Sequence, residues 1–171
     1  IAAAFLLNYY TDTVLIGAGA IATMFLVCRI FDGITDLVMG GIVDKTSSKL
    51  GKARPWLIAS APLTLLGIVL LMNVPSGLGD TGKLAYAYIT YIFMNCIVYT
   101  IYGISNTAML PLMTHDKNDS TVLATFSALG NNIIGLLAGS LITPLVINFG
   151  WKTSSVILGG VACVLILISG L

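Results

Sequence analysis

Three charged residues lie close together within an otherwise apolar stretch, and they are the residues of this chain best placed to do chemistry. They are Arg29, Asp32 and Asp36, at spacings of three and four residues. In a helix these spacings place all three side chains on one face, which Gly40 and Asp44 continue. A charge at the centre of a bilayer costs about 2.5–3.5 kcal/mol on insertion scales. If the helix spans a membrane, this face must therefore line a protein interior or a water-filled cavity.

The two carboxylates outnumber the positive charge beside them. In a packing interpretation, Arg29 neutralises one carboxylate and the cluster only joins helices. One arginine does not fully compensate Asp32 and Asp36, however, so the remaining carboxylate would hold a proton or bind a cation. Two carboxylates and the hydroxyl of Thr35 supply the hard oxygen ligands that suit sodium and lithium. Because ionisable residues inside a membrane generally mark ion pathways, we predict that Asp32 and Asp36 form a coupling site.

The segment that follows, residues 44–55, is hydrophilic and basic. Asp44 is expected near the C-terminal end of the preceding helix, where the partial negative charge of the helix makes a carboxylate unfavourable without a compensating cation. A lysine or arginine of the segment could hold this carboxylate in one conformation and release it in another. Alternatively, the basic segment meets anionic lipid headgroups. The spacing of the residues leaves both interpretations open.

The composition of the chain indicates its environment. The 171 residues are 57% hydrophobic and 9% charged, with a mean hydropathy of +1.00, whereas a soluble domain carries about 25% charged residues. The seven acidic residues are all aspartate, so few faces are expected to meet water. The net charge of +1 indicates no nucleic-acid partner. We expect an all-α, multi-pass integral membrane protein in contact with the lipid bilayer. Its cysteines, Cys28, Cys96 and Cys163, lie in apolar segments and are expected to be free thiols.

Apolar runs near the length of a membrane-spanning helix, about 20 residues, divide the chain into six helices. The predicted helices lie at about residues 1–10, 20–43, 56–73, 83–112, 121–149 and 153–171, with loops at about 44–55 and 113–120. Because the first and last runs meet the ends of the chain, we expect the first and sixth helices to be truncated. The two loops carry five of the eight lysines and arginines, so the positive-inside rule predicts that they face the cytoplasm.

A longer pattern joins the charged face to the basic segment. Its members are Arg29, Asp32, Asp36, Gly40, Asp44, Thr46, Ser48, Gly51, Lys52, Arg54 and Pro55. This pattern resembles the signature of the glycoside–pentoside–hexuronide:cation symporters, the melibiose-permease branch of the major facilitator superfamily. Residues 8–12 and 99–101 also resemble that family. The resemblance covers nearly the whole chain, and its specific part is the long pattern.

The resemblance implies a fold and a partner. Members of the family have twelve helices in two six-helix halves that rock around a central site. The chain would then be most of the N-terminal six-helix bundle, and its partner would be the C-terminal half of the same transporter. The implied location is the bacterial cytoplasmic membrane. No cofactor is expected apart from the coupling ion, which is sodium, lithium or a proton.

The resemblance also implies roles for individual residues. The implied cation-binding residues are Asp32, Asp36, Thr35 and Thr100. The residues implied for charge pairing and for a gate at the cytoplasmic end are Arg29, Asp44, Lys52 and Arg54.

The positions that bind sugar in the family differ here. Gly103 and Thr107 stand where melibiose permease has an acid and a tryptophan in helix four, and the arginine of helix five aligns near Ser127, Asn131 or Asn132. The family's substrate therefore does not transfer directly to this chain. The polar residues that offer weak substrate-binding candidates instead are Tyr99, Tyr102, Asn106, Asn131 and Asn132. The alternative role for the amides is hydrogen bonding between helices, which contributes about 0.6 kcal/mol on average.

The predicted function is secondary active transport of a glycoside, pentoside or hexuronide, coupled to symport of sodium or a proton. One alternative keeps the fold and changes the cargo, for example to a lysolipid. A second alternative is a membrane sensor that transports nothing and keeps its charges for packing. We expect no enzymatic activity, because the sequence contains no nucleophile–base pair, phosphate-binding loop or metal-binding motif.

Overall fold

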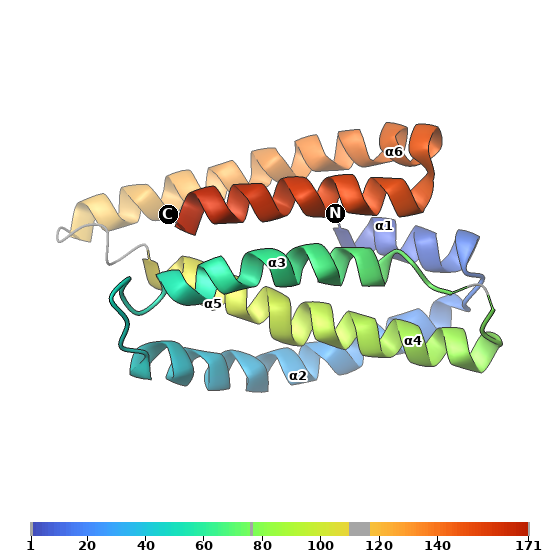
Figure 1. Ribbon diagram of the computed structural model, residues 1–171, viewed down its shortest axis with the longest axis horizontal. Helices are drawn as coiled ribbons and strands as arrows, with labels where there is room; N and C mark the ends of the chain where they lie inside the picture. The colour runs from blue at the N-terminus through green and yellow to red at the C-terminus, as the bar shows by residue number, and fades with distance from the viewer. Residues whose placement is uncertain (1, 76, 110–116, 171) are drawn as a thin grey trace.

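The computed structural model describes residues 2–75, 77–109 and 117–170, which fold into helices joined by short connections (Figure 1). The helical segments are α1 (Ala2–Asn8), η1 (Tyr9–Thr13), α2 (Ala18–Lys45), α3 (Arg54–Leu71), α4 (Asp80–Ile92), η2 (Phe93–Tyr99), α5 (Thr100–Met109) and α6 (Lys117–Gly170). The two η segments are π-helical. The described ranges contain no strand.

These segments join into longer rods. α1 runs directly into η1, and α4, η2 and α5 follow one another without a gap. α6 is interrupted at Gly150, whose φ of 73° and ψ of 167° are not helical. Glycine adopts a positive φ without the steric cost that other residues meet. At this residue the chain reverses, so the two legs of α6 form a hairpin (Figure 1). The described residues therefore form six helical rods.

Several helices have the length and composition of membrane spans. Among the described residues these are Arg54–Leu71, Asp80–Met109 and Thr121–Gly170, and the last of them holds both legs of α6. α2 has 28 residues, which at 1.5 Å per residue give about 42 Å, more than the hydrocarbon core of about 30 Å. Large apolar side chains on α2 and α6, including Leu37 and Ile147, are exposed. Such surfaces suit contact with lipid or with another part of a membrane protein.

The ends of α2 and α3 differ from the predicted ones by a turn or less. α2 begins two residues before the predicted range 20–43 and ends two residues after it. α3 begins at Arg54, so that Pro55 lies in its first turn. A proline fits there because the N–H that it lacks would have no partner within the helix.

The second half of the chain differs in its connections. α4 begins at Asp80, three residues before the predicted start. Residues 110–116, which include the predicted end of this helix and the start of the predicted loop, lie outside the described residues. α6 begins at Lys117, within the predicted loop. The predicted turn between the last two helices is reduced to Gly150.

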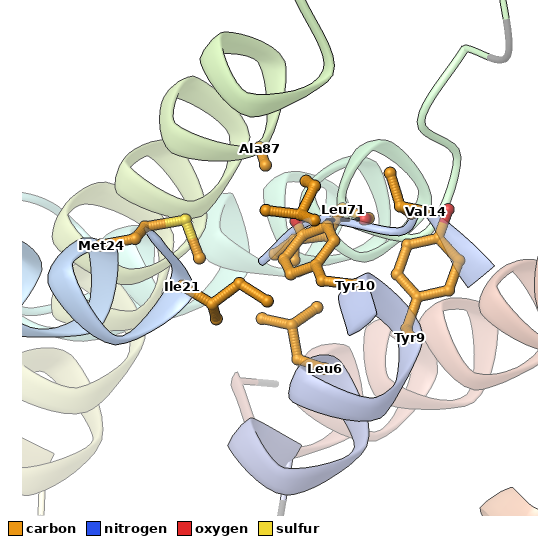
Figure 2. Packing of buried hydrophobic residues seen from close by; sticks show 9 residues of the cluster. Leu6, Tyr9, Tyr10, Val14, Ile21, Met24, Leu71 and Ala87 are labelled. Atoms are coloured by element: carbon orange, nitrogen blue, oxygen red, sulfur yellow. Dashed lines mark hydrogen bonds between the residues drawn. The ribbon is translucent and has the colours of Figure 1, made fainter. Parts of the chain in front are cut away.

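Two apolar clusters hold α2, one at each end. The first cluster, drawn in Figure 2, consists of Leu6, Tyr9, Tyr10, Val14, Ile16, Ile21, Met24, Leu71 and Ala87. The second consists of Met39, Val43 and Ala53, with Trp56, Ile101, Ile104, Ala108 and Met109 packed against them. The stretch from Arg29 to Asp36 lies between the clusters along α2. Packing on both sides therefore positions the charged face.

Polar contacts tie the first cluster to α3 and α6. The hydroxyl of Tyr10 donates a hydrogen bond to the carbonyl oxygen of Leu71 at 3.4 Å. The hydroxyl of Tyr9 accepts one from the backbone N–H of Val74 at 3.2 Å, and its ring centroid lies 4.9 Å from that of Trp151. η1, the C-terminal end of α3 and the second leg of α6 therefore meet at one end of the bundle.

The second leg of α6 packs closely against α3. The amide of Asn73 donates a hydrogen bond to Oγ of Ser155 at 3.2 Å. A Cβ added at Gly159 would lie 3.4 Å from both the Cα and the carbonyl oxygen of Leu65. A Cβ added at the neighbouring Gly160 would meet nothing within 4 Å. A side chain at position 159 would therefore press against α3, whereas one at position 160 would enter open space.

We predict that Gly159→Val destabilises the protein by about 1–3 kcal/mol, because the backbone of Leu65 cannot move aside as a flexible side chain would. The matched control is Gly160→Val, which makes the same change of helix propensity in open space and should have a much smaller effect. Thermal unfolding of the full-length protein in detergent measures both. Equal effects of the two substitutions would contradict the close packing of α6 on α3.

Candidate cation and substrate site

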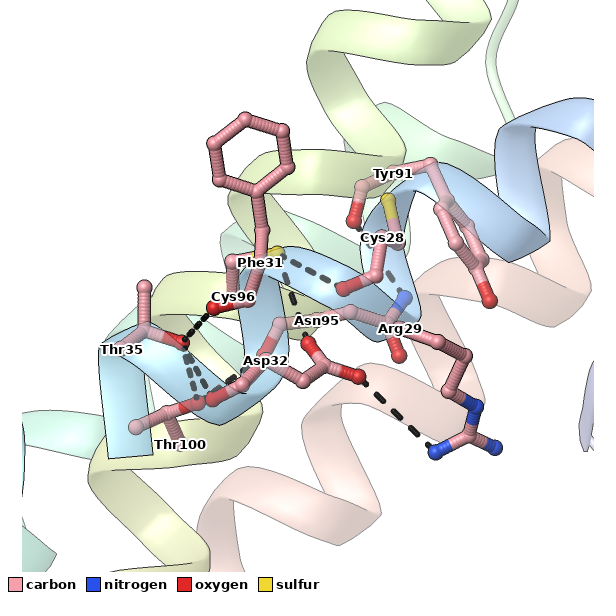
Figure 3. A network of polar contacts seen from close by, with 9 residues as sticks. All are labelled: Cys28, Arg29, Phe31, Asp32, Thr35, Tyr91, Asn95, Cys96 and Thr100. Carbon is pink, nitrogen blue, oxygen red and sulfur yellow. Dashed lines mark hydrogen bonds and ion pairs between the residues drawn. The ribbon is translucent and has the colours of Figure 1, made fainter. Parts of the chain in front are cut away.

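The carboxylate of Asp32 has one partner on its own helix and one on a neighbouring segment (Figure 3). Its Oδ2 lies 3.8 Å from Nη1 of Arg29, one turn earlier on α2. Its Oδ1 accepts a hydrogen bond from Sγ of Cys96, on η2, at 3.4 Å. The side chain of Asp32 is 24% exposed and that of Arg29 is 86% exposed. An ion pair with so exposed a partner contributes little stability, so Arg29 leaves the carboxylate available to a ligand.

Cys96 joins α2 to η2 through its thiol. The thiol is buried, and its sulfur also lies 3.9 Å from the carbonyl oxygen of Cys28. Cys28, Cys96 and Cys163 are all free thiols, as predicted. A role for Cys96 was not predicted, because no sequence pattern indicates which residues of α2 and η2 are in contact.

Two threonine hydroxyls lie beside this contact. Oγ1 of Thr35 and Oγ1 of Thr100 are 3.5 Å apart. The hydroxyl of Thr35 is also 3.1 Å from the carbonyl oxygens of Phe31 and Asp32. A hydroxyl that donates to a carbonyl keeps its lone pairs for a cation. The structure therefore brings together Asp32, Thr35 and Thr100, which are three of the four predicted cation-binding residues.

The fourth residue, Asp36, has a different environment. Its side chain is exposed, and it makes no hydrogen bond or ion pair with any other residue that the structure describes. It lies one helical turn after Asp32, about 6 Å further along the helix axis. The two carboxylates share a face of α2, and no positive charge stands between them. Their role as a joint cation site stays a prediction.

A cavity of about 430 Å³ opens beside Asp32. The residues that line it are Leu6, Arg29, Asp32, Ile68, Leu71, Met72, Tyr91, Met94, Asn95 and Tyr99. Apolar and aromatic walls with a few polar groups are typical of sites for small molecules, and so is this volume. Tyr99 is the one predicted substrate-binding residue among them. Tyr91 and Asn95 were not predicted, and the only signal for Asn95 is an amide within an apolar helix.

The segment η2 supplies Met94 to the cavity wall and three polar side chains to this site. Asn95, Cys96 and Tyr99 all belong to it, and Thr100 follows directly. The hydroxyl of Thr100 lies 3.5 Å from the carbonyl oxygen of Asn95, five residues earlier. In a π-helix the backbone hydrogen bonds also span five residues, and π segments are frequent at functional sites. This local widening places Cys96 against Asp32 and the side chains of Asn95 and Tyr99 at the cavity.

The other predicted substrate-binding residues do not line the cavity. Tyr102 and Asn106 are half-buried on α5. Asn131 and Asn132 are exposed on the first leg of α6, and the amide of Asn132 donates a hydrogen bond to the carbonyl oxygen of Ala128 at 2.9 Å within its own helix. A role for these four residues in substrate binding stays a prediction.

The predicted gate residues lie at the end of the bundle that holds the α2–α3 connection. Asp44, Lys52 and Arg54 are exposed, and no ion pair joins them within the described part of the chain. The connection is held instead by the indole N–H of Trp56, which donates to Oγ1 of Thr46 at 2.9 Å. The gate network therefore stays a prediction.

Comparison with known proteins decides the family. The MFS/sugar transport protein family matches residues 1–171, the whole chain. The chain belongs to this family. It is accordingly an integral membrane protein of the major facilitator superfamily, and the all-α fold class predicted from the sequence is confirmed.

Named relatives agree with this assignment. The symporter YnaJ of Bacillus subtilis is 35% identical over 95% of this chain and 37% of its own length. The inner membrane symporter YicJ of Escherichia coli is 35% identical over 83% of this chain and 30% of its own length. The isoprimeverose transporter of Lactiplantibacillus pentosus is 32% identical over 88% of this chain and 31% of its own length. The chain thus spans 30–37% of the length of these relatives. The resemblance to glycoside–pentoside–hexuronide symporters is confirmed.

In a transporter of this family the cavity should be open to water, and neighbouring residues of η2 test this. Tyr99 is 65% exposed and lines the cavity, whereas Val98 is 1% exposed. With the native cysteines replaced by serine, we expect Tyr99→Cys to react about tenfold faster than Val98→Cys with a water-soluble thiol reagent, because the reactive thiolate needs access to water. Slow labelling at both positions, measured by mass spectrometry of the full-length protein, would contradict a water-filled cavity.

Proposed function

We propose that this chain forms the N-terminal half of a secondary transporter that carries a sugar across the bacterial cytoplasmic membrane together with sodium or a proton. The observation that carries the proposal is the position of Asp32, a partly buried carboxylate in the wall of a cavity of small-molecule size. The names of the relatives support a sugar as cargo. They include an isoprimeverose transporter, a glycoside/cation symporter and a raffinose carrier.

In the proposed mechanism the cation binds first to the polar face of α2. Asp32 and Asp36 supply carboxylate oxygens, and Thr35 and Thr100 supply hydroxyl oxygens from the two sides of the α2–η2 contact. A cation there would neutralise the excess negative charge and draw α2 and the fourth rod together. Support comes from the 3.5 Å separation of the two hydroxyls.

The sugar would bind in the adjacent cavity. Tyr91 and Tyr99 offer aromatic rings and Asn95 offers an amide, groups that can stack on a sugar ring and bond its hydroxyls. Asp32 belongs both to the cation group and to the cavity wall. A cation that fixes this carboxylate therefore also prepares the sugar site, which gives a coupling free energy between the two ligands. The C-terminal half of the transporter would supply the rest of the cavity.

The gate would act at the cytoplasmic end. Asp44, Lys52 and Arg54 are proposed to pair in a conformation other than the present one, in which they are exposed and apart. Alternating formation and loss of such ion pairs is how rocking of two halves can close one side of a transporter at a time.

The cation site is tested by thermal stability of the full-length protein in sodium, lithium and a choline control. A cation that binds only the folded state stabilises it, by about 2.7 kcal/mol at 100 times its Kd. We expect sodium or lithium to raise the melting temperature of the wild type and not of Asp32→Asn or Asp36→Asn. Asp80→Asn, at the exposed start of α4, is the matched control and should respond like the wild type. An undiminished sodium response in Asp32→Asn would place the cation elsewhere.

Transport itself is tested in proteoliposomes that contain the full-length protein. We expect addition of sugar to drive uptake of sodium or protons, and Asp32→Asn to abolish accumulation of sugar against its gradient. Competition by glycosides, and none by lysolipids, supports a sugar carrier, whereas the reverse result supports the lipid alternative. If no solute moves a cation, the transporter proposal is overturned in favour of the sensor alternative.

A further inference from the structure

We infer that the thiol of Cys96 positions the carboxylate of Asp32 for the coupling cation, and thereby sets the affinity for that cation. This inference rests on the proposed function. Among the described residues, the carboxylate has two polar partners, and Cys96 is the one that comes from outside α2. Cys96 is thus a direct side-chain link between the carboxylate of Asp32 and the fourth rod.

The two partners act on opposite oxygens of the carboxylate. Arg29 attracts Oδ2 from a distance of 3.8 Å, and the thiol donates to Oδ1 at 3.4 Å (Figure 3). Arg29 is largely exposed and free to move, whereas Cys96 is buried and fixed by packing. Without the thiol, the carboxylate would turn towards the guanidinium, which would then compete with a cation for its oxygens. The thiol therefore keeps Asp32 available to the cation.

Because Cys96 belongs to η2, its hold on the carboxylate of Asp32 is linked to the cavity that η2 helps to line. Asn95 precedes it, Tyr99 follows it by three residues, and both line the cavity. The same sulfur lies 3.9 Å from the carbonyl oxygen of Cys28, so it also fixes the distance between α2 and η2. A cation that displaces or strengthens the thiol contact acts directly on the segment that carries the cavity side chains. Cys96 is accordingly a positioning residue that touches the proposed cation ligand.

The experiment measures the sodium concentration that gives half of the maximal rise in melting temperature of the full-length protein. Removing the donor in Cys96→Ala or in Cys96→Val, which keeps nearly the side-chain volume, should raise this concentration about 3- to 10-fold, the equivalent of one hydrogen bond. Cys96→Ser restores a donor and should stay within about twofold of the wild type. Cys163→Ala, on α6 and not among the residues that line the cavity, is the matched control and should change nothing.

The readout separates positioning from packing. If Cys96 only packs, its substitutions lower the melting temperature without sodium and leave the half-saturating concentration unchanged, and the inference is overturned. It is also overturned if serine behaves like alanine and valine.

A second experiment tests whether Arg29 competes with the cation for the carboxylate of Asp32. In the Arg29→Gln background, removal of the thiol should have a smaller effect on sodium affinity than in the wild type, because no guanidinium is left to capture the carboxylate. The non-additivity of the two substitutions measures their coupling. If removal of the thiol changes the sodium affinity equally in the wild type and in Arg29→Gln, the proposed competition between Arg29 and the cation for Asp32 is overturned.

The controls also separate failure of the inference from failure of the proposed function. If the wild type responds to sodium, Asp32→Asn does not, and all Cys96 variants match the wild type, only the inference about Cys96 is overturned. If sodium stabilises neither the wild type nor Cys163→Ala, the sodium site itself is overturned and the inference with it.

Discussion

A carboxylate inside a membrane helix needs polar partners, and the partners of Asp32 set the arrangement around it. One partner belongs to the same helix and is mostly exposed, and the other is a buried thiol on η2. The clusters at the two ends of α2 keep the helices in contact on either side of this point. Apolar packing thus determines where the helices meet, and the few polar groups between the clusters determine what can bind there.

The same carboxylate explains why a cation site and a sugar site would be coupled over so short a distance. The side chain of Asp32 accepts a hydrogen bond from Cys96 and also lines the cavity. No long chain of contacts is required between the two ligands, because they share a residue. The aromatic and amide groups of η2 lie within a turn of Cys96, so in the proposed mechanism a small shift of this segment would change both sites together.

The charged face of α2 was predictable because helical spacing depends only on positions within one helix. Composition and the length of the apolar runs likewise predicted an all-α membrane protein. The contacts of Cys96, Tyr91 and Asn95 were not predictable, since they depend on how two helices pack and on a π segment that changes the register of one of them. The amides of α6 were chosen by residue type alone, and residue type does not tell which side of a helix faces a cavity; Asn132, for example, does not line it.

The π-helical segment η2 also determines what the loss of one residue from the fourth rod would do. Because each hydrogen bond in η2 spans five residues instead of four, the segment contains one residue more than an α-helical turn requires. Loss of one residue there converts the π turn into an α turn and leaves α4 and α5 in their orientations. The same deletion within α2 would rotate the side chains after it by about 100° relative to those before it. The cost of such a loss in η2 would fall on the site, because the π-helical register places Asn95, Cys96 and Tyr99 there.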